Sequence, residues 1–185
     1  MTDGIHQNRV SLRNFKVADF ASEETLCFSA TVLFDGRPIA EARNDGHGGC
    51  TSLRPLEHNR AKLAEAEAFA KTLPPVIIEH DDDSSRNFTI SVTLEFLVDS
   101  LASQTHSDKK LRAAFKRQIN NQVLFIRDGK LLHLQGVQLK AVTNKSALFS
   151  QLRAKQKEDI IILAELPLEE AFVLWKRHML EEGGS

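Results

Sequence analysis

The sequence predicts an α+β fold in which an antiparallel β-sheet built from hairpins packs against four to five helices. Extended segments are joined by Asp35-Gly36 and by Asp128-Gly129, and an Asp-Gly pair is typical of a tight hairpin turn because glycine accepts positive φ. Helical periodicities occur in separate segments instead of alternating strictly with strands, which favours an antiparallel sheet. The length predicts a single domain over 1–185, with a subdivision near 79–86 as the alternative.

Each element follows from a local pattern. Period-two alternation or a short apolar run predicts strands at 10–17, 26–34, 37–43, 76–78, 88–92, 123–126, 131–134 and 160–163. Apolar residues at helical spacing predict helices at 55–73, 94–102, 108–119, 144–157 and from 167 onward. Helix starts are indicated by capping residues or by proline, at Pro55, Thr93, Ser107 or Asp108, Thr143 or Asn144, and Pro167. Residues 79–85 are expected to form an exposed acidic loop.

Charge is distributed unevenly along the chain. Residues 1–100 carry 10 Lys/Arg and 16 Asp/Glu, 101–157 carry 12 and 2, and 158–185 carry 2 and 7. The basic segment 101–157 favours contact with a phosphate backbone or an acidic protein surface, and solvated helix faces are the alternative. The candidate binding residues are Lys109, Lys110, Arg112, Lys116, Arg117, Arg127, Lys130, Arg153, Lys155 and Lys157.

The second candidate site is the glycine-rich segment 44–51, Asn-Asp-Gly-His-Gly-Gly-Cys-Thr. Glycines allow a backbone to turn its amides toward one anion, and the N-terminus of the helix expected to follow would favour a phosphate. The spacing matches neither a Walker loop nor Gly-x-Gly-x-x-Gly, so a structural turn is the alternative. The phosphate-loop candidates are Gly46, His47, Gly48, Gly49, Cys50 and Thr51.

Two residues of this segment, His47 and Cys50, raise further chemical hypotheses. A thiolate near a histidine and a helix N-terminus is a nucleophile, but a free cysteine is more often a buried core residue. Structural zinc needs four ligands, and no second ligand pair accompanies these two residues. We therefore expect a protein without catalytic residues, metal or cofactor. If the chain does catalyse a reaction, Cys50 and His47 are the candidate residues.

The longest apolar run, Ile160 to Ala164, is far shorter than the roughly 20 residues that cross a bilayer. The N-terminal residues show no secretory pattern, so Cys27 and Cys50 are expected to be reduced thiols. These features predict a cytoplasmic protein with no membrane partner.

Several motifs carry a resemblance over about residues 10–80: Ser22-Glu23-Glu24-Thr25, Asp35-Gly36, Asn44 to Thr51, and Glu65-Ala66-Glu67-Ala68. In these motifs the chain resembles an uncharacterised family of small proteins from bacteriophages and mobile elements. No activity is established for the family, so no residue role follows from it. The resemblance implies a bacterial host cytoplasm and an accessory gene, and such proteins often modulate host DNA metabolism or block host defences.

The leading hypothesis is a non-catalytic binding protein of a phage or mobile element. It would act on host nucleic-acid-handling machinery through the basic segment 101–157, and an anti-CRISPR-like counter-defence inhibitor is its most specific form. The expected partner is a host protein, a ribonucleoprotein complex or nucleic acid. The alternative is a nucleotide-phosphate-binding protein, either a sponge or a Cys/His hydrolase, that holds a small nucleotide with residues 44–51.

Overall fold

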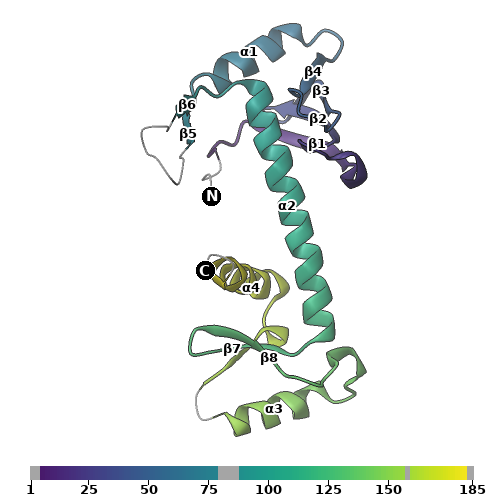
Figure 1. Ribbon diagram of the computed structural model, residues 1–185, viewed down its shortest axis with the longest axis vertical. Helices are drawn as coiled ribbons and strands as arrows, with labels where there is room; N and C mark the ends of the chain where they lie inside the picture. The colour runs from purple at the N-terminus through teal and green to yellow at the C-terminus, as the bar shows by residue number, and fades with distance from the viewer. Residues whose placement is uncertain (1–4, 79–87, 157–158, 183–185) are drawn as a thin grey trace. The chain divides into compact units, whose positions relative to one another are not determined.

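The computed structural model describes residues 5–78, 88–156 and 159–182, and the chain divides into two compact units (Figure 1). Unit 1 is Met1–Ser107 and unit 2 is Asp108–Ser185. The boundary falls inside the helix α2 (Leu94–Asn121), which belongs to both units. The predicted subdivision near 79–86 lies outside the described residues.

Unit 1 is built on a four-stranded antiparallel sheet with the strand order β1-β2-β3-β4. Its strands are β1 (Val10–Val17), β2 (Phe28–Phe34), β3 (Arg37–Asn44) and β4 (Ser52–Pro55). The predicted hairpin at Asp35-Gly36 is confirmed, because Phe34 pairs with Arg37 and both turn residues have positive φ, at 50° and 75°. Two consecutive left-handed residues match the twist of the flanking strands, and this makes an Asp-Gly turn favourable here.

The core of unit 1 lies between one face of this sheet and two helices. Alternate residues of β2 point inward, and α1 (Arg60–Ala70) and the first half of α2 bring small and branched side chains against them. The central buried residues are Ala30, Val32, Phe34, Ala66, Ala70, Leu94, Leu97 and Val98. A separate two-stranded pairing of β5 (Val76–Ile78) with β6 (Phe88–Ile90) flanks residues 79–85, and the acidic loop predicted there lies outside the described residues.

Two sequence-based expectations about helices are wrong. Pro55 does not open a helix: it ends the edge strand β4, opposite Ala40, and α1 begins at Arg60. Proline is tolerated there because an edge strand has backbone groups without a ladder partner. The predicted helices at 94–102 and 108–119 form one continuous helix, because the intervening residues contain neither Gly nor Pro and nothing interrupts the backbone ladder. The predicted cap at Thr93 is confirmed, since its Oγ1 accepts a hydrogen bond from Phe96 N–H at 3.2 Å.

Unit 2 contains a three-stranded antiparallel sheet with the order β8-β7-β9. The strands are β7 (Leu124–Arg127), β8 (Lys130–His133) and β9 (Ile161–Ile162), and the predicted Asp128-Gly129 hairpin between the first two is confirmed. The helices α3 (Lys145–Lys155) and α4 (Leu168–Glu182) complete the unit with the second half of α2. Asn144 caps α3, because its side-chain oxygen accepts from Ala147 N–H at 3.0 Å.

Within the described residues, short 3₁₀ segments connect these elements at η1 (Asp19–Ala21), η3 (Leu139–Ala141) and η4 (Leu163–Glu165). With four α-helices and antiparallel sheets in the described part of the chain, the α+β prediction is confirmed. Within that part, no helix is both long and apolar enough to pass through a bilayer.

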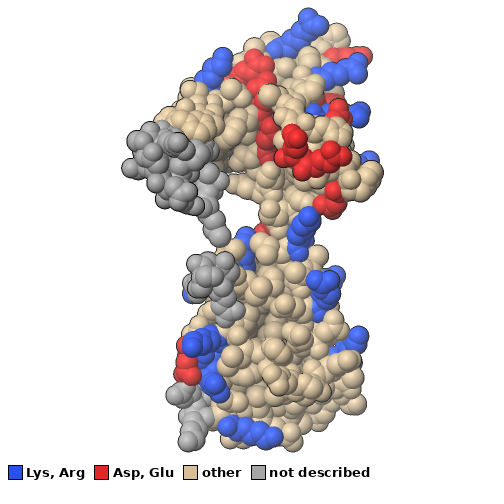
Figure 2. All heavy atoms as spheres, in the orientation of Figure 1, with Lys and Arg blue, Asp and Glu red and all other residues tan. Residues whose placement is uncertain are grey.

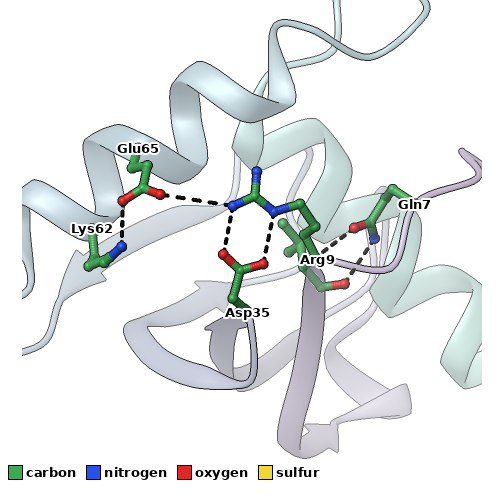
Figure 3. A network of polar contacts seen from close by, with 6 residues as sticks. Gln7, Arg9, Asp35, Lys62 and Glu65 are labelled. Atoms are coloured by element: carbon green, nitrogen blue, oxygen red, sulfur yellow. Dashed lines mark hydrogen bonds and ion pairs between the residues drawn. The ribbon is translucent and has the colours of Figure 1, made fainter.

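A polar network joins the first hairpin of unit 1 to α1 (Figure 3). Arg9 donates from Nε and Nη2 to the two carboxylate oxygens of Asp35, at 2.8 and 2.6 Å, and its Nη2 lies 3.9 Å from Glu65 Oε1. The same guanidinium lies over the rings of Phe34 and Phe69, at 4.3 and 4.9 Å from their centroids. The arrangement holds the guanidinium plane in one orientation by two parallel hydrogen bonds and two aromatic faces.

This network makes stability depend on pH through Asp35. Its hydrogen bond to Arg9 holds the pKa of the Asp35 carboxyl below its ordinary value of 3.8. A carboxyl whose pKa is lowered in the folded state stabilises the fold above its unfolded pKa and loses that contribution as the pH falls through its folded pKa. We expect wild type to melt at a higher temperature than Asp35→Asn near pH 7, and the difference to shrink below about pH 4. Asparagine keeps the left-handed turn, so a difference that stays constant down to about pH 2 would contradict the role of this ion pair.

Candidate functional site

The glycine-rich segment 44–51 is organised by one buried side chain, Asn44 at the end of β3. Its Oδ1 accepts from Gly46 N–H and from Thr25 Oγ1, both at 2.9 Å. Its Nδ2 donates to the Gly49 carbonyl at 3.0 Å and to Thr51 Oγ1 at 3.2 Å. A buried amide with two donors and two acceptors engaged has its hydrogen-bonding capacity fully used, so it fixes the loop in one conformation.

The same loop clamps the preceding segment of the chain. The Gly46 carbonyl accepts from the backbone N–H groups of Glu23, Glu24 and Thr25, at 3.1, 3.0 and 3.2 Å. Gly48 N–H donates to Thr25 Oγ1 at 3.3 Å. The two motifs Ser22 to Thr25 and Asn44 to Thr51 are therefore two halves of one hydrogen-bonded structure.

The loop is also tied to α2 through Thr51. This buried hydroxyl donates to Asp99 Oδ1, and burial raises the pKa of the Asp99 carboxyl. Asp99 was not among the residues singled out from the sequence. The one available signal is its charge within the mainly apolar start of α2, and its partner lies 48 residues away along the chain.

The phosphate-loop hypothesis relies on free glycine amides and on a helix N-terminus after the loop, and the structure differs from it on both points. The amides of Gly46 and Gly48 donate to side chains of the protein itself, Asn44 and Thr25. The loop leads into strand β4, so the expectation that a helix N-terminus follows directly is wrong. A phosphate-binding loop of the expected kind needs free backbone amides and a helix N-terminus directly after the loop.

A surface depression does lie beside the loop, with a volume of about 870 Å³. It is lined by Glu41, Arg43, Asn44, Asp45, His47, Gly49, Cys50, Ser52 and Arg54. The expectation that Cys50 is buried is wrong: Cys50 is exposed and lines this surface depression. Arg43 is engaged by Asp45, with Nε 2.8 Å from Oδ1.

The structure does not assemble His47 and Cys50 into a dyad. His47 Nδ1 lies 3.3 Å from Glu23 Oε2, and no hydrogen bond joins His47 to Cys50 among the contacts of the described residues. Nor do the described residues contain a group of three or more His, Cys, Asp or Glu side chains placed to hold a metal ion. A thiolate nucleophile needs a base within hydrogen-bonding reach, and that geometry is missing between these two side chains.

Three arginines of the basic segment are engaged within unit 2. Arg112 bonds to Asp108 at 2.8 Å and to Glu169 at 2.9 and 3.0 Å, and its guanidinium lies 4.3 Å from the Phe172 ring centroid. Arg127 donates to Gln156 at 2.8 Å, and Arg153 pairs with Glu165. Glu169 lies 57 residues from Arg112 and Gln156 lies 29 residues from Arg127, so these two contacts could not be predicted from the sequence.

The remaining cations of α2 lie together on its exposed side. We call the exposed residues Lys109, Lys110, Lys116 and Arg117 the basic strip. At about 100° per residue, these four positions span roughly 120° of the helix circumference, and the buried Phe115 lies on the opposite side. Lys130 and Lys155 are exposed elsewhere in unit 2, and Lys157 lies outside the described residues.

The charge asymmetry of the sequence coincides with the two units. Unit 1 carries 10 Lys/Arg and 16 Asp/Glu, whereas unit 2 carries 14 Lys/Arg and 9 Asp/Glu. On the face drawn in Figure 2, acidic side chains gather mainly on unit 1, whereas basic side chains lie on both units. The basic strip therefore lies on a unit that is positively charged overall, which strengthens its attraction for a polyanion.

Comparison of the chain with protein-family models, with curated proteins and with solved structures found no match. The resemblance to phage and mobile-element proteins therefore stays a prediction from the motifs. The geometry of the two units is the basis for the function proposed below.

Proposed function

We propose that this chain is a non-catalytic binding protein that captures nucleic acid, alone or within a nucleoprotein complex, through the basic strip. The observation that carries the proposal is the placement of Lys109, Lys110, Lys116 and Arg117 on one exposed side of α2. Arg112, Arg127 and Arg153 are not part of the strip, and each contacts residues of unit 2.

A helix is a suitable frame for such contacts because it fixes the spacing of the charges. Lys109 and Lys116 are seven residues apart, which corresponds to about 10 Å along the helix axis. A nucleic-acid strand presents phosphates in regular succession, so cations spread over this length can contact several of them. Each cation that neutralises a phosphate releases a condensed counterion, and this release favours binding at low salt.

The cellular role we propose is that of a phage or mobile-element protein acting on nucleic-acid-handling machinery in a bacterial cytoplasm. Its most specific form is an anti-CRISPR-like counter-defence inhibitor that occupies the nucleic acid of a host effector complex. The motif resemblance and the positive charge of unit 2 support this role.

The second candidate function is binding of a nucleotide phosphate in the depression beside residues 44–51. Arg54 and His47 are exposed and line that depression. Arg54 offers a positive charge to a phosphate, and His47 offers a hydrogen-bond donor. It ranks second because the amides of Gly46 and Gly48 are already used within the protein.

Reversing two charges of the strip should abolish most of the binding. We expect Lys116→Glu with Arg117→Glu to weaken affinity for a labelled single-stranded oligonucleotide by about tenfold or more at low salt. The melting temperature should stay close to that of wild type, because both side chains are exposed. Fluorescence anisotropy measures the affinity, and circular dichroism measures the melting temperature.

The matched control is Arg37→Glu with Arg60→Glu, which makes the same change in net charge at exposed positions of unit 1. This control should bind as wild type does, apart from the small effect of net charge. Equal affinities of the two double variants would refute the role of the strip. A small nucleotide released from the denatured wild-type protein, with no oligonucleotide binding, would support the second candidate.

A further inference from the structure

A surface pocket of about 680 Å³ lies in unit 2 at the C-terminal end of α2. Six of its lining residues carry hydrogen-bonding side chains: Asn121, Gln122, His133, Gln135, Gln138 and Lys140. None of its described lining residues is a carboxylate. The volume lies within the range of about 300–1,000 Å³ that is usual for small-molecule sites.

The backbone around this pocket is fixed by its own hydrogen bonds. Gln122 N–H donates to the Gln118 carbonyl at 2.7 Å, which completes the last turn of α2. Leu134 N–H donates to the Val123 carbonyl at 3.0 Å, and Gly136 has a φ of 73°, which turns the following segment toward η3. The polar side chains therefore extend from a backbone that is already ordered, and this lowers the entropic cost of binding a ligand.

The chemistry of the pocket favours a neutral, hydrogen-bonding ligand group over a phosphate. Primary amides offer a donor and an acceptor side by side, and the edge of a nucleobase offers the complementary pair. The C-terminal end of a helix carries partial negative charge, which attracts an amino group, and Lys140 is the one lysine among the lining residues. Asn121 Nδ2 donates a hydrogen bond to the Arg117 carbonyl at 2.8 Å. Asn121 therefore offers its Oδ1 to a ligand as a hydrogen-bond acceptor.

The pocket and the basic strip are consecutive on the same helix. Asn121 follows Arg117 by four residues, which is about one helical turn or 6 Å along the axis. A strand whose phosphates lie on the strip can therefore place its next base at the pocket. A base within a duplex is held in the stack by its partner and its neighbours, so only an unpaired base can turn into this pocket.

We propose that the pocket at Gln122 and Gln138 binds an unpaired base that carries an exocyclic amino group, adenine foremost, from the strand held by the basic strip. Adenine is preferred because asparagine and glutamine form paired hydrogen bonds with its amino group and ring nitrogen. Thymine and uracil lack the amino group. This inference rests on the proposed function and adds single-strand and base preference to it.

The test uses the full chain and fluorescein-labelled oligonucleotides of about 12 nucleotides, within the range of known single-strand sites. We expect anisotropy titrations to give about tenfold tighter binding of oligo(dA) than of oligo(dT). The duplex of the two should bind no better than oligo(dT). Gln122→Leu with Gln138→Leu should lower the affinity for oligo(dA) to that for oligo(dT).

Two control measurements distinguish loss of the base pocket from unfolding and from damage to the basic strip. The double variant should bind oligo(dT) as wild type does, which shows that it is folded and that its strip is intact. Gln151→Leu, at an exposed position of α3 outside the pocket, should keep the preference for adenine.

Equal binding of oligo(dA) and oligo(dT) by wild type, or equally tight binding of the duplex, would overturn the base pocket and leave the proposed function standing. Failure of wild type to bind any of these oligonucleotides would overturn both.

Discussion

Replacing Gly46 with alanine should destabilise unit 1 by about 3 kcal/mol or more, which is a large effect for a single methyl group. A Cβ at this position would lie 2.0 Å from the Ala21 carbonyl oxygen and 2.9 Å from Cys27 Cβ. The residue also has a φ of 90°, which costs a side-chain-bearing residue about 1–3 kcal/mol. Urea unfolding followed by circular dichroism measures the free energy of unfolding.

Gly49→Ala is the matched control in the same loop. A Cβ there would meet no heavy atom within 4 Å, and the backbone does not adopt positive φ. We expect its free energy of unfolding to stay within about 0.5 kcal/mol of wild type. Equal destabilisation by the two variants would mean that the clamp between Gly46 and residues 23–25 does not hold unit 1 together.

Trp175→Ala should destabilise unit 2 by about 3–5 kcal/mol. Trp175 is only 1% exposed, and its ring centroid lies 5.5 Å from that of Phe115 and 6.2 Å from that of Phe172. Its Nε1 donates to Gln118 Oε1 at 2.8 Å, so the truncation also removes the partner of a polar group. Thermal unfolding followed by circular dichroism at 222 nm measures the loss of stability. Tryptophan fluorescence cannot be used, because Trp175 is the only tryptophan and the variant lacks it.

Val173→Ala provides the comparison on the same helix, because Val173 is 57% exposed and α4 presents it to solvent. We expect a change of about 0.5 kcal/mol or less. A similar loss in both variants would contradict the aromatic cluster of Phe115, Phe172 and Trp175 as the centre of this part of unit 2.

Local patterns were sufficient to predict much of the fold. The alternation over β1 and β2 and the two Asp-Gly turns depend on neighbouring residues, and the structure confirms them. Pro55 was assigned to a helix because its position in the sequence suits a helix start, while its actual place is decided by pairing with Ala40 in another strand. Ser107 and Asp108 resemble helix caps, but α2 continues through them, and Asp108 accepts hydrogen bonds from Arg112 and Lys176.

The candidate sites were harder to predict because they depend on contacts between distant segments. The glycine-rich loop is visible in the sequence, but its role as a clamp depends on the contacts of Thr25 with Asn44 and of Thr51 with Asp99, which form only in the folded chain. The excess of basic residues was visible in the sequence. The pairing of Arg112 with a glutamate 57 residues away required the structure, and so did the placement of the basic strip on one side of α2.

The most direct test of the proposed function is the salt dependence of oligonucleotide affinity for wild type and for Lys116→Glu with Arg117→Glu. Wild type should lose affinity steeply as salt rises, because each phosphate contact on a single strand contributes about −0.7 to the slope of log affinity against log salt. Removal of two contacts should make the slope shallower by about 1.4. Identical slopes for the two proteins would show that the basic strip does not contact phosphates, and would contradict the proposed function.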